Sequence, residues 1–239
     1  MKGNPKHIVI VGMSRSGTSL LYSMMTNALK EYEFKDGEIS ALSLKPMHKT
    51  ISKRPLDCLA LDQILELNDR EVRVIFCVRD PRDVICSVHK NVPHDYFIGF
   101  LNQYFVIPEK NICQLTNPGL LQIIQSYMRH RDKVLCVKYE DLTQQTEQTM
   151  KKINLFIDEE MRKDDFSLNE QSQVPNGVIA ALNGIRKVDA MSVEQWKKHP
   201  WRVWSEFSNH PQMHDIMAIL DYERDKKWFI NHFKRRLPL

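Results

Sequence analysis

Short apolar runs rich in β-branched residues recur along the chain and end in glycine or charged residues. The first covers residues 7–11 (HIVIV) and leads directly into Gly12. Runs of this kind are typical of strands that are buried on both faces of a parallel sheet. Two more occupy residues 72–78 and 133–139, so the pattern predicts three buried strands.

A helical pattern follows each of these runs. Residues 18–30 repeat leucine and methionine three and four positions apart, which indicates an amphipathic helix. Asp80 and Pro81 are typical of the N-cap and the first position of a second helix, and residues 140–157 fit a third. Strands that lie far apart in sequence and alternate with helices indicate crossover connections. We therefore expect an α/β fold with a parallel sheet flanked by helices on both faces.

The rest of the chain fits a single domain, residues 1–239. Residues 88–132 are expected to form a mostly helical insertion, and the polar residues 160–190 a loop or a lid. Helices are expected again from Ser192. The sequence contains no internal repeat and no linker, and its length is common for one α/β domain.

Charge and hydropathy narrow the class of partner. The formal net charge is +4, which suits an anionic ligand but falls short of the basic balance of a nucleic-acid-binding protein. No apolar run approaches the ~20 residues that cross a bilayer, and the apolar run near the N-terminus is too short for a signal peptide. We therefore expect a cytoplasmic protein with no membrane span and no nucleic-acid partner.

A glycine loop joins the first predicted strand to the first predicted helix. It runs from Gly12 to Gly17 with the spacing GxxxxG of a nucleotide P-loop, but Thr18 stands where that loop carries its lysine. Backbone N–H groups and the helix dipole bind phosphate at such a junction. Because the loop carries Arg15, we expect a cradle for one phosphate with a cation beside the group attached to it. The alternative is a simple turn before a core helix. The residues that would line the cradle are Ser16, Gly17, Thr18 and Ser19.

A second anion site is indicated after the second strand. Arg79 stands at the carboxyl end of that strand, where open α/β sheets place their ligands, and Ser87 lies about two turns into the next helix. A guanidinium and a hydroxyl near one point suit a phosphate. Two separated cradles fit a mononucleotide with phosphates at both ends of its ribose. The alternative interpretation of the segment RDPRD is a capped helix with local ion pairs.

These motifs resemble those of the sulfotransferase superfamily, whose members use 3′-phosphoadenosine 5′-phosphosulfate (PAPS). Residues 11–21 (VGMSRSGTSLL) resemble its 5′-phosphosulfate loop, and residues 74–89 (VIFCVRDPRDVICSVH) resemble its 3′-phosphate element. Residues 134–142 (VLCVKYEDL) are similar to its third signature strand. Residues 184–200 resemble the tyrosylprotein sulfotransferase segment that folds over the cofactor. The four motifs occur in the family's order.

The resemblance implies a P-loop NTPase-like three-layer sandwich. It also implies transfer of a sulfuryl group from PAPS to a hydroxyl or amine of a small molecule, a glycan or a peptide, which leaves adenosine 3′,5′-bisphosphate. Arg15 and Lys45 would stand beside the oxygen that bridges phosphorus and sulfur, and no metal ion is expected. The residues implied in cofactor binding are Arg15, Ser16, Gly17, Thr18, Ser19, Arg79, Ser87, Tyr139, Arg186 and Lys187.

The acceptor needs a general base, and two residues compete for this role. Glu38 lies close to the position of the catalytic glutamate in the tyrosylprotein and some bacterial members. His48, together with Lys45, resembles the Lys-x-His of the cytosolic small-molecule members, but with one extra residue between the two. We favour Glu38. Two other functions stay open: a P-loop small-molecule kinase, which the missing lysine disfavours, and a non-catalytic nucleotide-binding module.

Overall fold

The computed structural model describes residues 4–87, 95–107, 112–116, 118–168 and 192–234. The chain divides into two compact units, each built from two segments of the sequence. The first unit comprises Met1–Arg79 and Gln125–Ala190, and the second comprises Asp80–Ile124 and Met191–Leu239. Because compact units can also form inside one domain, the prediction of a single domain stays a prediction.

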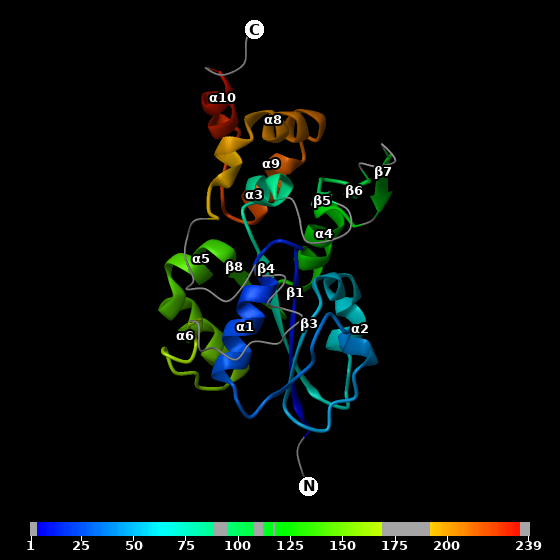
Figure 1. Ribbon diagram of the computed structural model, residues 1–239, viewed down its shortest axis with the longest axis vertical. Coiled ribbons are helices and arrows are strands. Elements are labelled where there is room, and N and C mark those ends of the chain that lie inside the picture. The colour runs from blue at the N-terminus through cyan, green and yellow to red at the C-terminus, as the bar shows by residue number, and fades with distance from the viewer. Residues whose placement is uncertain (1–3, 88–94, 108–111, 117, 169–191, 235–239) are drawn as a thin grey trace. The chain divides into compact units, whose positions relative to one another are not determined.

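The first unit contains a five-stranded sheet in the order β2-β3-β1-β4-β8 (Figure 1). Every neighbouring pair in it is parallel, so the predicted parallel α/β sheet is confirmed. The central strand is β1, which pairs with both β3 and β4. The strands are β1 (Lys6–Gly12), β2 (Glu33–Phe34), β3 (Thr50–Lys53), β4 (Glu71–Val78) and β8 (Leu135–Lys138).

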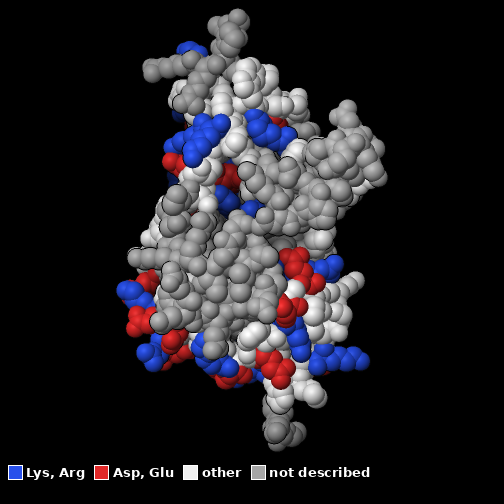
Figure 2. All heavy atoms as spheres, in the orientation of Figure 1, with Lys and Arg blue, Asp and Glu red and all other residues white. Residues whose placement is uncertain are grey.

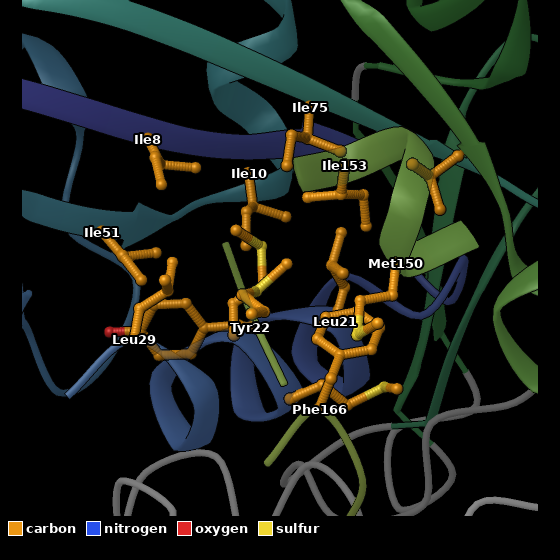
Figure 3. Close-up of a cluster of buried hydrophobic side chains, with 14 of the residues drawn as sticks. Ile8, Ile10, Leu21, Tyr22, Leu29, Ile51, Ile75, Met150, Ile153 and Phe166 are labelled. Atoms are coloured by element: carbon orange, nitrogen blue, oxygen red, sulfur yellow. The ribbon is translucent and has the colours of Figure 1, made fainter. Parts of the chain in front are cut away.

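Helices flank both faces of this sheet. On one face, Ile8 and Ile10 of β1 meet Leu21 of the first helix and Ile153 of a later one in a fully buried cluster (Figure 3). On the other face, the rings of Phe76 and Tyr127 lie 5.0 Å apart. The helices of this unit are α1 (Thr18–Ala28), η1 (Ala41–Ser43), η2 (Pro55–Ala60), α2 (Leu61–Leu65), α5 (Tyr139–Gln144), α6 (Thr146–Ile157) and the end of α4 (Leu120–His130).

The segment after α6 packs against this core. Met161, Phe166 and Leu168 are buried in the same cluster as α1 and α6, and the Asn27 amide donates to the carbonyl of Asp165 at 2.7 Å. Residues 161–168 contain no helix or strand, which agrees with the predicted loop, and they pack against the core. The rest of that predicted lid, from residue 169, lies outside the described residues.

The second unit contains a small antiparallel sheet where we predicted helices. Its strands are β5 (Asp95–Ile98), β6 (Gln103–Ile107) and β7 (Ile112–Thr116), in that order. Aromatic and β-branched residues, which favour strands, are concentrated in β5 and β6, and the Gly99 N–H donates to the Asn102 carbonyl at 2.8 Å to close the turn. The helical prediction is therefore wrong for these strands, but it is confirmed for residues 120–130, which form α4.

The helices predicted after Ser192 are present in the described part of the second unit. Arg82 lies between two of their tryptophans, with its guanidinium 4.4 Å from the ring centre of Trp196 and 4.6 Å from that of Trp228. It also pairs with Asp80 at 2.6 Å and with Glu223 at 2.9 Å. The helices of this unit are α3 (Pro81–Cys86), η4 (Gln195–Lys198), α8 (Pro200–Asn209), α9 (Met213–Ile219) and α10 (Lys227–Phe233). Within the described ranges, no helix has the length and hydropathy needed to cross a membrane.

Candidate nucleotide site at the carboxyl edge of the sheet

The backbone of β4 holds the loop between β1 and α1. The N–H of Met13 and the hydroxyl of Ser16 both donate to the carbonyl of Cys77, at 3.2 and 3.0 Å. The Ser16 hydroxyl also lies 2.6 Å from the carbonyl of Met13, so this hydroxyl points into the loop's own backbone. A Cβ on Gly12 would lie 2.1 Å from the Cys77 oxygen, and glycine is therefore required at this position.

Two residues of the loop have left-handed backbones, Arg15 with φ 68° and Gly17 with φ 85°. Left-handed residues in such a loop turn successive N–H groups toward one point and make an anion-binding concavity. The first bond of α1 runs from the Leu21 N–H to the Gly17 carbonyl at 2.9 Å, and the helix itself offers no acceptor to the N–H groups that precede it. The loop and the first turn of α1 therefore fit an anion of the size of phosphate or sulfate.

Lys53, the last residue of β3, lies beside the start of α1. Its side chain is only 5% exposed, and its Nζ donates to the Ser19 hydroxyl at 3.2 Å and to Glu38 Oε1 at 2.8 Å. Because β1 and β3 run parallel with Ile10 opposite Lys53, Lys53 reaches the same edge of the sheet as the loop. A buried ammonium thus joins the predicted loop to the favoured base, Glu38.

Lys53 was not among the predicted site residues, because β3 was not predicted. The strand has four residues, and three of them, Thr50, Ser52 and Lys53, are polar although all are buried. A hydrophobic pattern does not identify such a strand. A signal was available in the β-branched pair of Thr50 and Ile51 shortly before Pro55, since proline commonly begins a helix.

The structure does not bring His48 to the loop. This residue precedes the amino end of β3, is 68% exposed, and lies 4.0 Å from Glu33. Lys45 is also exposed, and no hydrogen bond or ion pair joins it to any other residue that the structure describes. Of the four residues predicted to be catalytic, the structure therefore places Arg15 and Glu38 near the loop.

Arg79 and Tyr139 meet the loop from two other strands. Arg79 follows β4 and donates from Nη1 to the carbonyl of Arg15 at 3.1 Å. Its guanidinium lies 4.7 Å from the ring centre of Tyr139. A Cβ on Gly17 would lie 2.6 Å from Cδ2 of the same ring. The structure thus brings together residues of three motifs that are widely separated in the sequence.

The segment RDPRD combines both interpretations that the sequence left open. Asp80 caps α3 by accepting from the Arg82 N–H at 2.9 Å, and Asp83 accepts from the N–H groups of Glu194 and Trp196, both at 2.8 Å. These residues build the second unit, as the interpretation of a capped helix with ion pairs requires. Arg79, the first residue of the segment, belongs to the first unit and contacts the loop.

The remaining candidates lie in the second unit or outside the described residues. Ser87 belongs to the second unit, where its N–H donates to the Val84 carbonyl at 3.1 Å. Arg186 and Lys187 lie outside the described residues.

Among the residues that are described, no three of the types that bind metals are grouped to hold an ion. Among the described residues on the face shown in Figure 2, acidic and basic side chains both occur.

The fold and the loop are those of an α/β protein of the P-loop type. The family profile described as the sulfotransferase domain matches residues 5–199, so the chain belongs to the sulfotransferase family. The prediction of a PAPS-dependent sulfotransferase is thereby confirmed at the level of the family. Among solved structures, mouse sulfotransferase SULT7A1 complexed with PAP is similar over 92% of this chain and 89% of that chain, with 12% identity and a TM-score of 0.46. The search of curated proteins gave no match.

Proposed function

We propose that this chain moves a sulfuryl group from PAPS to a hydroxyl or amine of a small-molecule, glycan or peptide acceptor, with Glu38 as the general base. One observation carries the proposal. The buried Lys53 connects Glu38 to Ser19 at the start of α1, next to the anion-binding loop. A base, a cation and an anion cradle therefore share one edge of the sheet.

The loop binds the 5′ end of the cosubstrate in this proposal. When bound, PAPS supplies a sulfur atom joined to a phosphate oxygen that can leave. The N–H groups of Gly17, Thr18 and Ser19 hold that phosphate, and the cations of Arg15 and Lys53 face the negative charge that develops on the leaving oxygen. Fixed donors of this kind stabilise a transition state because they need no reorganisation during the reaction.

Glu38 accepts the proton of the acceptor. The acceptor oxygen or nitrogen forms a bond to sulfur while the bond between sulfur and the bridging oxygen breaks, and the bonding electron pair stays on the departing phosphate. The proton moves to the carboxylate of Glu38, which is 51% exposed and can reach a bound acceptor. The ion pair with Lys53 orients this carboxylate. The position of His48 before the amino end of β3 favours Glu38 over it.

Arg79 and Tyr139 bind the 3′ end of the nucleotide in the same proposal. A guanidinium offers five donors in a planar fork, which suits a phosphate, and the guanidinium of Arg79 lies over the Tyr139 ring. For Ser87, Arg186 and Lys187, a contact with the cofactor rests on the family resemblance alone.

The first test is thermal stabilisation by adenosine 3′,5′-bisphosphate, compared with ATP and Mg²⁺. A ligand at about 100 times its dissociation constant adds about 2.7 kcal/mol to stability, so the bisphosphate should raise the melting temperature by several degrees. Stabilisation by ATP and Mg²⁺ alone would contradict the proposal and favour a kinase.

The base is tested with a matched pair of glutamates. Glu38→Gln should keep bisphosphate binding and lose transfer of the sulfuryl group from PAPS to a panel of phenol, amine and sugar acceptors. Glu33→Gln is the control, because Glu33 is about equally exposed at 49% but pairs with His48. Undiminished transfer by Glu38→Gln would remove Glu38 from the mechanism.

A further inference from the structure

We infer that Arg79 positions the 5′ loop in addition to binding the 3′-phosphate, so that the loop depends on Arg79 even for a nucleotide without a 3′-phosphate. The inference rests on the proposed function, which supplies the nucleotide. It concerns the hydrogen bond from Arg79 Nη1 to the carbonyl of Arg15, at 3.1 Å.

The direction of the Arg15 carbonyl affects whether the loop can bind an anion. Arg15 has a left-handed backbone without being glycine, and such a conformation persists only where surrounding contacts impose it. A peptide oxygen that turned into the concavity would repel the anion that the N–H groups attract. The positive guanidinium of Arg79 binds this oxygen and so fixes the peptide with its N–H groups available to the anion.

The ring of Tyr139 supports the side chain of Arg79. Its side chain is 7% exposed and lies over the ring of Tyr139. The same ring fills the space beside Gly17, where any Cβ would meet it at 2.6 Å. Both left-handed residues of the loop are therefore braced from outside, Arg15 by the guanidinium and Gly17 by the ring.

The guanidinium of Arg79 has several hydrogen-bond donors. The bond from Nη1 to the Arg15 carbonyl is one contact of a group that carries five N–H donors in a planar fork. A guanidinium can therefore contact more than one acceptor at once. A lysine carries a cation but no planar face for the Tyr139 ring, so it would replace only part of this role.

The consequence is a coupling between the two ends of the nucleotide site. A guanidinium that served only the 3′-phosphate would leave the binding of a 5′-monophosphate unchanged when removed. A guanidinium that also braces the loop lowers the affinity for both kinds of nucleotide. It also lowers the turnover number at saturating PAPS, because a displaced loop misplaces the cation of Arg15.

The experiment is calorimetric titration of AMP and of adenosine 3′,5′-bisphosphate into the wild type, Arg79→Ala and Arg79→Lys. Arg73→Ala is the matched control, because Arg73 lies near the amino end of β4, the strand that Arg79 follows, and pairs with Glu71. We expect Arg79→Ala to weaken AMP binding about tenfold or more, in line with the loss of a charged hydrogen bond. The loss should be larger for the bisphosphate. Arg79→Lys should restore part of the bisphosphate affinity but little of the AMP affinity, and Arg73→Ala should match the wild type.

A second variant distinguishes a local effect on the loop from a general loss of folding. Tyr139→Leu keeps Arg79 but removes the ring that supports it, and should weaken AMP binding while the melting temperature of the free protein stays within a few degrees of the wild type. Unchanged AMP affinity in Arg79→Ala, with weakened bisphosphate binding, would overturn the inference and leave the proposed function intact. Wild-type protein that binds the bisphosphate but not AMP would also overturn the inference. Wild-type protein that binds neither nucleotide would overturn the proposed function as well.

Discussion

The two ends of the parallel sheet in the first unit both bury charged groups, but they do so in different ways. At the amino end, one oxygen of Glu159 accepts from Lys6 at 3.0 Å, Lys49 at 2.9 Å and Tyr32 at 2.7 Å. Burial alone would raise the pKa of Glu159, but these hydrogen bonds lower it to about 2. The charges at this end therefore compensate one another within the protein.

The carboxyl end combines buried cations with a backbone arranged for an anion. Lys53 and Arg79 are both nearly inaccessible to solvent, and beside them the loop has two left-handed residues and two glycines that tolerate no side chain. Buried charge alone therefore does not identify a site. What distinguishes the carboxyl end is the combination of buried cations with a backbone conformation that the sequence can adopt only at some cost.

The largest expected effect comes from the loop. Gly12→Ala places a methyl group 2.1 Å from the carbonyl of Cys77 at a residue with φ 134° and should lower the free energy of unfolding by about 4 kcal/mol or prevent folding. The control is Gly37→Ala, which has φ 85° but no atom within 4 Å of the new Cβ, and should cost about 1 kcal/mol. Urea denaturation measures both. Equal losses would mean that the contact with β4 does not constrain the loop.

The next prediction compares two lysines that pair with a glutamate, the buried Lys53 at the carboxyl end and the half-exposed Lys49 at the amino end. Lys53→Met should reduce transfer from PAPS about 100-fold, as the loss of one transition-state donor does in other enzymes. Lys49→Met removes a partner of Glu159 at the amino end and should leave turnover unchanged. Release of adenosine 3′,5′-bisphosphate from PAPS provides the rate. A similar rate for the two variants would show that the two ends of the sheet do not differ in their effect on turnover.

The amino end should determine how stability depends on pH. Burial, and then the nearby Arg70, lower the pKa of His7 from 6.5 to about 4. The unfolded chain therefore takes up a proton at a higher pH than the folded one, and stability is lost as the pH falls below about 6.5. Between pH 7 and pH 5 the loss should be about 2 kcal/mol.

Urea midpoints at these two pH values measure this loss. His7→Gln should flatten that part of the profile, whereas His48→Gln, at an exposed position, should not. A slope that survives in His7→Gln would assign the pH dependence to another group.

The smallest effect is expected for Glu159→Gln. The amide keeps hydrogen-bonding capacity, and Lys6 still donates to the carbonyls of Ile157 and Asp158, so the loss of stability at pH 7 should be about 1–2 kcal/mol. Because the folded-state pKa of Glu159 is depressed, its contribution is present above about pH 4.5 and is lost toward pH 2. Bisphosphate affinity should not change. A weakened affinity would show that the two ends are linked.

Sequence reasoning found the parts of the fold in which burial coincides with apolar residues. β1, β4 and β8 were predicted because their cores are continuous apolar runs, and α1 because of its helical spacing. β3 was not predicted, since a strand that buries Thr50, Ser52 and Lys53 lacks that signal. The strands β5 and β6 were assigned to helices because short apolar runs alone do not distinguish the two structures.

The parts of the candidate site that lie close together in the sequence were predictable. The parts that depend on which strands pair in the sheet were not. The glycine loop and Arg79 followed from their positions beside apolar strands. The choice between Glu38 and His48 could not follow from their distances along the chain, because Glu38 pairs with Lys53 at the carboxyl end of β3 whereas His48 precedes its amino end. Lys53 depends on the pairing of β3 with β1, and a single sequence does not show which strands are neighbours.

The aromatic cluster around Arg82 gives the second unit a built-in optical signal. The chain has four tryptophans, namely Trp196, Trp201, Trp204 and Trp228, and all of them belong to that unit. Indole fluorescence therefore follows the unfolding of the second unit alone, whereas far-ultraviolet circular dichroism follows the helices and strands of both units. Coincident transitions for the two signals would mean that the units unfold as one cooperative domain. Separated transitions would mean that the chain contains two.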